Sequence, residues 1–167
     1  MNCKICNKIH EWTREEIIRE RSQTGERLKK AIEGLSPQFL KKRPEPKAWS
    51  IHEIVVHLKD TEMVYGMRYK SILSEVKPGL ITYDQNLWAK NLEYKKQDFN
   101  HALSLLNLTR SENLHLLSSM NEKDFQKSGK HPEYGELSIR ELFLHNLSHD
   151  ISHLSQIQKV RKKIESG

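Results

Sequence analysis

The stretch SIHEIVVHL, at residues 50–58, combines a helix start with a histidine in apolar surroundings. Ser50 and Glu53 fit the S/T-x-x-E capping box, in which a hydroxyl and a carboxylate each satisfy a backbone N–H of the first helical turn. The same pattern occurs at residues 13–16 and 138–141, and an amphipathic run follows each of the three starts. The sequence therefore predicts three long helices that begin near residues 14, 51 and 139.

Glycines and prolines set the expected ends of these helices. We expect helices over residues 14–33 and 51–75, a third helical region over 84–119 that is broken near Lys96, and a fourth helix over 139–163. A loop with Gly129, Pro132 and Gly135 is expected before the last helix. Four helices without a convincing strand predict an all-α four-helix bundle. The long connections predict at least one crossover.

Length and composition favour one domain. The chain of 167 residues can bury a core of its own, and we expect residues 1–12 to form an N-terminal tail and residues 13–167 to form the bundle. No apolar run approaches the roughly 20 residues that a membrane-spanning helix needs. The first residues, MNCKICNKIHEW, lack the apolar middle of a signal peptide. These observations predict a cytoplasmic protein.

The net charge of +6 does not predict a nucleic-acid-binding protein. The first 50 residues carry 12 basic and 7 acidic side chains, so most of the excess lies there. Basic and acidic residues alternate in this segment, as on a solvated helix face, and form no basic stripe. The charge therefore indicates no nucleic-acid partner. A small-molecule substrate is expected from the histidines and the family resemblance described below, and a homodimer stays open.

Three histidines recur at a spacing of four residues. His145, His149 and His153 advance by about 40° and about 6 Å per step on a helix, so neighbours share a face and can hold one metal ion. The outer two lie about 12 Å apart, so all three cannot hold the same ion. One adjacent pair and a ligand from another helix are needed, which leaves the pairs 145/149 and 149/153 open.

His57 is the natural third ligand. It lies among apolar residues, where an unpaired polar ring costs a few kcal/mol. A hydrogen bond to a carbonyl or carboxylate would also satisfy it, but the His-x3-His pair makes a metal the better interpretation. Three neutral imidazoles leave an open coordination position, which is typical of catalytic sites.

Several neighbouring side chains are candidates for a supporting role. Asp60, one turn after His57, and Gln156, one turn after His153, are placed to orient the ligand rings, although Asp60 is equally well explained as a surface residue. Trp49 and Trp88 are expected in the core or in a wall of the site. His52, in the first turn of its helix, is expected to be exposed.

The chain resembles the DinB superfamily. Residues 47–58 contain the family's Trp-Ser helix opening and first histidine, and residues 135–156 contain its glycine, its serine helix start and its His-x3-His-x2-Gln ending. The resemblance covers the chain after about residue 13. It implies a four-helix bundle in which zinc or nickel is held by His57, His149 and His153.

The resemblance also implies a function. Members of the family include thiol transferases, so we expect a metal-dependent transfer of a low-molecular-weight thiol, similar to bacillithiol, to electrophilic small molecules. Two alternatives stay open: a hydrolase that uses metal-activated water, and a non-enzymatic, stress-related metal-binding or scaffold protein. An enzyme is preferred to the last of these.

The N-terminal cysteines fit this pattern poorly. Cys3 and Cys6, followed by His10, are typical of half a zinc site, but no second Cys/His pair completes it. A redox role or an additional metal stays open, and a tail is the preferred interpretation.

Overall fold

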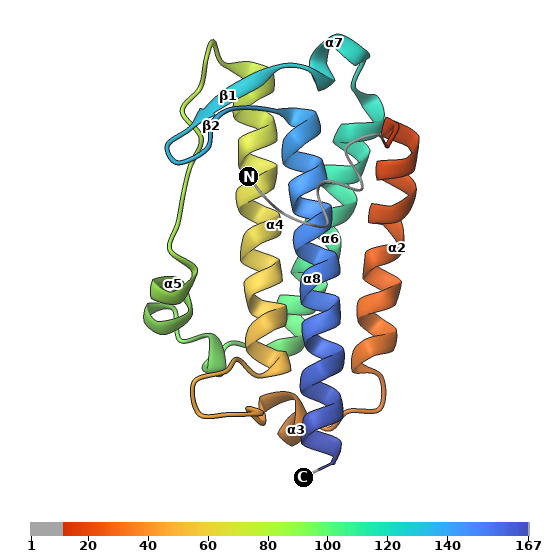
Figure 1. The fold of residues 1–167 in the computed structure, drawn as a ribbon, viewed down its shortest axis with the longest axis vertical. Coiled ribbons are helices and arrows are strands. Elements are labelled where there is room, and N and C mark those ends of the chain that lie inside the picture. The colour runs from red at the N-terminus through yellow and green to blue at the C-terminus, as the bar shows by residue number, and fades with distance from the viewer. Residues whose placement is uncertain (1–11, 167) are drawn as a thin grey trace.

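The computed structural model describes residues 12–166, and these form a bundle of four long helices (Figure 1). The long helices are α2 (Arg14–Ile32), α4 (Ile51–Ser74), α6 (Phe99–Ser119) and α8 (Ile139–Glu165). The shorter elements are α3 (Pro37–Lys41), α5 (Gln85–Asn91), the 3-10 helix η1 (Tyr94–Lys96), α7 (Glu122–Phe125), β1 (Ser128–His131) and β2 (Gly135–Ser138). The predicted four-helix bundle is confirmed.

The three capping boxes are present, and they explain why α2, α4 and α8 begin where the sequence predicts. The side chains of Thr13, Ser50 and Ser138 accept hydrogen bonds from the backbone N–H three residues later, at 3.2, 3.3 and 3.2 Å. The third helical region is broken as expected. Glu93 adopts a left-handed conformation with φ of 48°, and Asp98 then caps the start of α6.

The helices are not joined as simple antiparallel hairpins. Both α2 and α4 pack against α6 and α8, so α2 and α4 lie on one diagonal of the bundle. Figure 1 shows that α4 and α6 run in the same direction, opposite to α2 and α8. The chain must therefore return along the bundle between α4 and α6. Residues 75–98, which include α5 and η1, form this crossover, and the predicted crossover is confirmed.

The expectation of a bundle without strands was wrong in one place. Residues expected to form a loop before α8 form a small hairpin, in which β1 pairs antiparallel with β2. The start of the crossover adds to it, because Leu80 N–H donates to Lys130 O and Lys130 N–H donates to Pro78 O. Gly129 permits this close approach, since a Cβ there would lie 2.6 Å from Leu80. Four-residue strands are too short to give a recognisable alternation in the sequence.

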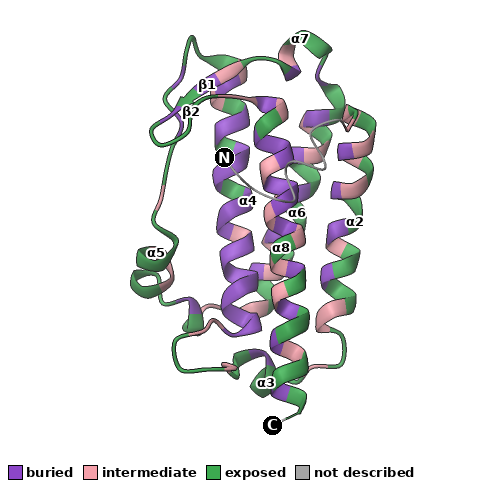
Figure 2. Cartoon of the chain, viewed as in Figure 1, coloured by how far each residue is buried: buried purple, intermediate pink, exposed green. Residues whose placement is uncertain are grey.

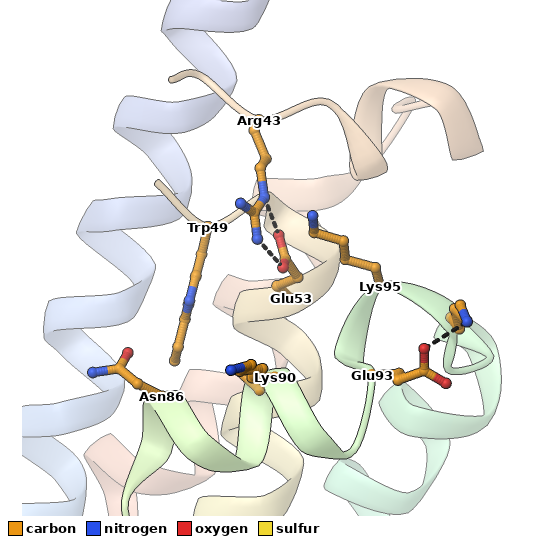
Figure 3. Close-up of a pocket in the computed structure, with 9 residues that line it drawn as sticks. Arg43, Trp49, Glu53, Asn86, Lys90, Glu93 and Lys95 are labelled. Carbon is orange, nitrogen blue, oxygen red and sulfur yellow. Dashed lines mark hydrogen bonds and ion pairs between the residues drawn. The ribbon is translucent and has the colours of Figure 1, made fainter. Parts of the chain in front are cut away.

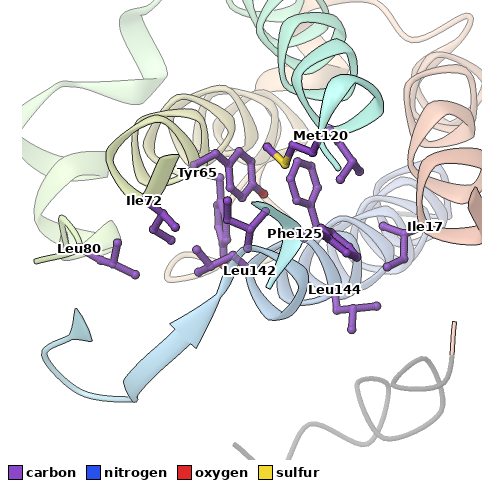
Figure 4. Packing of buried hydrophobic residues seen from close by; sticks show 12 residues of the cluster. Ile17, Tyr65, Ile72, Leu80, Met120, Phe125, Leu142 and Leu144 are labelled. Carbon is purple, nitrogen blue, oxygen red and sulfur yellow. The ribbon is translucent and has the colours of Figure 1, made fainter. Parts of the chain in front are cut away.

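The core forms two main clusters along the bundle. In the cluster near the hairpin, Tyr65 and Ile72 of α4 pack with Leu142 of α8, and Met120 and Phe125 close the end of the bundle (Figure 4). The other cluster joins Leu28, Ile54, Leu106 and Ile157 from the four long helices near the opposite end, among others. Figure 2 shows that α4 is buried over most of its length. No helix within residues 12–166 has the length and apolar character needed to cross a bilayer.

A buried polar cluster lies between the two apolar regions. It takes one charged side chain from each long helix: Arg21 from α2, Glu62 from α4, Arg110 from α6 and Asp150 from α8. Arg21 pairs with Glu62 and Asp150, and Arg110 pairs with the same two carboxylates at 3.3 and 2.9 Å. Burial alone would raise the pKa of Glu62, but the two arginines outweigh it and lower that pKa. The cluster is electrically balanced.

The expected exposure of His52 was also wrong. Its side chain is buried, and its ring lies 5.5 Å from that of Phe99, at the start of α6. The end of the crossover and the first turn of α6 cover this side of α4, so a residue in the first helical turn is not free to reach solvent.

Candidate metal centre

His57, His149 and His153 come together where α4 and α8 face each other. One ring nitrogen from each lies within 4.8 Å of the others. The Nε2 atom of His149 is 3.1 Å from Nε2 of His57 and 3.1 Å from Nε2 of His153. His57 is fully buried, and the other two rings are partly buried.

The spacing of these nitrogens fits one bound cation. In a tetrahedral site with Zn–N bonds of about 2.0–2.1 Å, the ligand nitrogens lie about 3.3 Å apart. A neutral imidazole has one N–H donor, so three nitrogens that face one another cannot satisfy each other fully by hydrogen bonds. A donor set of three imidazoles suits zinc or nickel. The residues present therefore fit the metal that the sequence predicts.

Burial keeps all three rings neutral. Loss of solvation lowers the pKa of His57 to about 3, with a smaller contribution from His153. The same cause, reinforced by the other histidines, lowers the pKa of His149 well below its ordinary value. Burial also lowers the pKa of His153, although contact with Gln156 opposes it. Neutral rings have the free lone pair that metal binding requires.

Gln156 contacts His153 as its spacing suggests. The Nδ1 atom of His153 lies 2.7 Å from Oε1 of Gln156, an acceptor. Nδ1 must therefore carry the proton, which leaves the lone pair on Nε2, the atom that faces the other two histidines.

Asp60 makes a different contact. Its Oδ1 atom pairs with Lys59 at 2.8 Å, and no hydrogen bond joins it to His57 within residues 12–166. Asp60 instead lies close to the hydroxyl of Tyr94, whose pKa is raised by burial and by this carboxylate. The Nδ1 atoms of His57 and His149 are buried without a hydrogen-bond partner among the described residues.

His145 lies outside the group of three. His145 lies on α8, one turn before His149. Its Nδ1 atom is 2.6 Å from the hydroxyl of Tyr65 on α4. The structure thus brings together the pair 149/153, and His145 contributes to the neighbouring cavity.

Aromatic side chains lie next to His57. The ring of Trp49 lies 5.0 Å from that of His57. The hydroxyl of Tyr83 hydrogen-bonds to Thr61 at 2.7 Å, and its ring lies 4.5 Å from Trp88. Sequence reasoning singled out both tryptophans but missed Tyr83, because no periodicity indicates where a crossover segment lies. An aromatic residue shortly after Pro78-Gly79 was the only signal.

A cavity of about 190 Å³ opens beside His149. Its walls come from α4, the crossover, the hairpin and α8, and they include Tyr65, Arg68, Tyr83 and His145. Glu133, which is exposed, is the one carboxylate among its described lining residues. The cavity therefore offers a bound molecule access to His149 but no buried carboxylate as a general base.

A second cavity, of about 340 Å³, is lined by Trp49, which does not line the first one (Figure 3). Its cationic side chains include Arg43 and Lys96, which are paired with Glu53 and Glu93. These pairs engage two of its four cationic side chains, and Lys90 and Lys95 form no ion pair among the described residues.

The N-terminal candidates cannot be placed. Cys3, Cys6 and His10 lie outside the described residues.

Comparisons with known proteins identify a family and agree with this fold. A family profile described as the DinB superfamily matches residues 20–157. A Bacillus subtilis protein named "Putative metal-dependent hydrolase YfiT" is 26% identical over 137 residues, which cover 80% of this chain and 77% of that protein. An Oceanobacillus iheyensis protein named "Putative metal-dependent hydrolase OB0782" is 25% identical, over 90% of this chain and 86% of its own length.

Two solved structures share the fold. YfiT from Bacillus subtilis, described as a probable metal-dependent hydrolase with an unusual four-helix bundle topology, superposes with a TM-score of 0.84 and 22% identity. The superposition covers 91% of this chain and 87% of that one. TT2238, a four-helix bundle protein, superposes with a TM-score of 0.62 and 18% identity, over 88% of this chain and 99% of that one.

Proposed function

The chain belongs to the DinB superfamily, and from this premise we propose that it is a metal-dependent enzyme that transfers a low-molecular-weight thiol to electrophilic small molecules. The observation that carries the proposal is the convergence of three neutral imidazole nitrogens beside a cavity. His57, His149 and His153 would hold zinc or nickel. The bound metal would supply Lewis acidity and lower the pKa of a thiol or water in its open position.

Electrostatics favours an anionic thiol in that position. Three neutral ligands leave the double positive charge of the ion uncompensated. The nearby buried carboxylates are already engaged, because Asp150 pairs with arginines and Asp60 pairs with Lys59. A thiolate is both anionic and soft, which suits zinc. It is also itself a nucleophile, so the lack of a buried carboxylate base in the cavity is no obstacle.

The chain's own residues position the reactants. Gln156 fixes the ring of His153, and Tyr83 and Thr61 place two hydroxyl groups beside His57. The cavity is small, which favours a compact thiol and a small electrophile over a polymer.

The test begins with metal analysis of the purified protein. Zinc- and nickel-loaded protein is then assayed with a panel of thiols, including cysteine, coenzyme A and bacillithiol, against reactive electrophiles. We expect metal-dependent conjugation above the rate of a His149→Ala blank. Equal rates in the blank and the wild type would contradict the proposal and favour a non-enzymatic binding protein.

Hydrolysis is a second candidate, favoured by the names of the relatives. It predicts turnover of esters or amides by metal-loaded protein in the complete absence of thiol. Thiol transfer predicts no product under those conditions, so one assay separates the two.

A further inference from the structure

Arg68 is a buried arginine in the cavity that adjoins the three histidines. It lies on α4, three helical turns after His57, and its side chain is 7% exposed. Its Nε and Nη2 atoms both donate to the carbonyl oxygen of Ile81, at 2.9 and 2.7 Å. The guanidinium carbon lies 5.0 Å from the centre of the Tyr65 ring. Tyr65 of α4 and Ile81 of the crossover therefore hold the guanidinium in one orientation.

The charge of Arg68 is not balanced by a carboxylate. No ion pair joins it to an acidic side chain within residues 12–166, and its Nη1 atom has no hydrogen-bond partner there. The other two buried arginines, Arg21 and Arg110, each pair with Glu62 and Asp150. A buried charge that no opposite charge balances is costly even when it is hydrogen-bonded, so Arg68 differs from the other two buried arginines.

The groups that face Arg68 do not supply a counter-charge. Burial, and next the arginine itself, lower the pKa values of His131 and His145, so both rings are neutral near pH 7. Glu133 is the one carboxylate among the described residues that line the cavity, and it is exposed at the tip of the hairpin. The interior of the cavity is therefore positive, and a metal on the histidines would make it more so.

We propose that the molecule handled at the three-histidine site carries an acidic group, a carboxylate or a phosphate, and that Arg68 binds this group. The proposal rests on the proposed function for the reacting end of the molecule. A guanidinium fixed in place matches a planar carboxylate or a phosphate, and little conformational entropy is lost when it binds. The backbone positions of His57 and Arg68 are about 16 Å apart along the helix axis. The acidic group and the reacting atom therefore belong to opposite ends of the bound molecule.

The test compares thiols that differ only in the charge of the far end. Cobalt-substituted protein is titrated with 6-mercaptohexanoate and with 6-mercaptohexanamide, and the absorption band of cobalt-bound thiolate gives each dissociation constant. Shorter and longer acid–amide pairs find the best length. We expect the acid of the best pair to bind about tenfold more tightly than its amide, the size of one charge-assisted hydrogen-bonded contact.

Variants assign the preference to Arg68. In Arg68→Met the acid and the amide should bind equally, whereas Arg68→Lys should keep part of the preference. Lys70→Met is the matched control, because it removes one positive charge from the exposed side of the same helix. It should leave the tenfold ratio unchanged. A mercaptoalkyl phosphate of matched length distinguishes a carboxylate from a phosphate. The natural acidic group should give the larger ratio of dissociation constants between Arg68→Met and the wild type.

The outcomes separate this proposal from the proposed function. Failure of the metal site would abolish the cobalt band for acid and amide alike. Binding of hexanoate and hexanamide to metal-free protein, measured by calorimetry, would then still test Arg68, with the same expected difference between wild type and Arg68→Met. A wild type without a preference for the acid overturns the proposal. The proposal is also overturned if Arg68→Met, with wild-type helicity, keeps the wild type's preference for the acid over the amide.

Discussion

At the scale of single residues, the candidate site depends on chemistry that two helices bring together. His149 and His153 could be predicted as partners because the four-residue spacing on one helix is a local property. The ring of His57 could be assigned to them only through its apolar surroundings and the family resemblance. Arg68 and Tyr83 could not be predicted, because their place in the cavity depends on the path of the crossover.

The first prediction concerns metal binding. His57→Ala, His149→Ala and His153→Ala should each lose most of the bound metal, because two imidazoles hold the ion much more weakly than three. His145→Ala is the matched control: it removes a histidine of the same helix that lies outside the group, and it should keep the metal. Metal content is measured after purification. Loss of metal in His145→Ala but not in His153→Ala would move the site by one helical turn.

The second prediction concerns pH. His57 has an ordinary pKa of 6.5 in the unfolded chain and a pKa of about 3 in the fold. Between these values the unfolded chain binds more protons, so the free energy of unfolding falls as the pH falls. One such group contributes at most about 1.4 kcal/mol per pH unit.

Urea denaturation of metal-free protein at several pH values between about 7 and 5 checks this. The wild type should lose stability more steeply with acid than His57→Gln, which cannot titrate. Parallel pH profiles for the two proteins would contradict the assigned pKa.

At the scale of elements, capping explains what could be predicted. The starts of α2, α4 and α8 follow from hydrogen bonds between residues three apart, which the sequence states directly. The hairpin could not be predicted, because its strands have only four residues each and the crossover at Gly79 and Leu80 adds to it only in the folded chain. The same contact explains why an apparently loop-like segment is ordered.

The third prediction compares two glycines within long helices. A Cβ at Gly66 of α4 would lie 2.7 Å from the side chain of Asn113, which donates hydrogen bonds to Glu62. Gly66→Ala should therefore destabilise the protein despite the better helix propensity of alanine. Gly25→Ala in α2 meets Asn107 only at 3.6 Å and should stabilise by about 0.5–1 kcal/mol. Urea denaturation of both variants measures the difference, and changes of equal sign would refute it.

At the scale of the whole molecule, the buried cluster of four charges ties the long helices together. Arg21→Met would leave Glu62 and Asp150 with Arg110 alone, so we predict a loss of about 3–5 kcal/mol in the free energy of unfolding. Arg27→Met is the control, because Arg27 lies on the same helix and pairs with Glu20 near the surface. The free energy of unfolding of Arg27→Met should fall by less than about 1 kcal/mol. Similar losses in denaturant titrations of both variants would argue against the cluster's role.

The last prediction concerns the N-terminal segment. Deletion of residues 1–11 removes Cys3, Cys6 and His10 but leaves Thr13, which caps α2. The truncated protein should bind as much metal at the histidine site as the full chain does. Metal analysis of the full and truncated chains makes the comparison, and loss of a second equivalent would assign the cysteines to another metal site.

The histidines and much of the cavity wall come from different parts of the fold, and this has an evolutionary consequence. The three histidines lie on α4 and α8, whose positions the core and the buried charges fix, while much of the cavity wall comes from the crossover and the hairpin. Connections of this kind tolerate substitution and insertion better than packed helices do. Descendants of one ancestral bundle can therefore diverge in substrate by changing these two segments, while they inherit the metal chemistry unaltered.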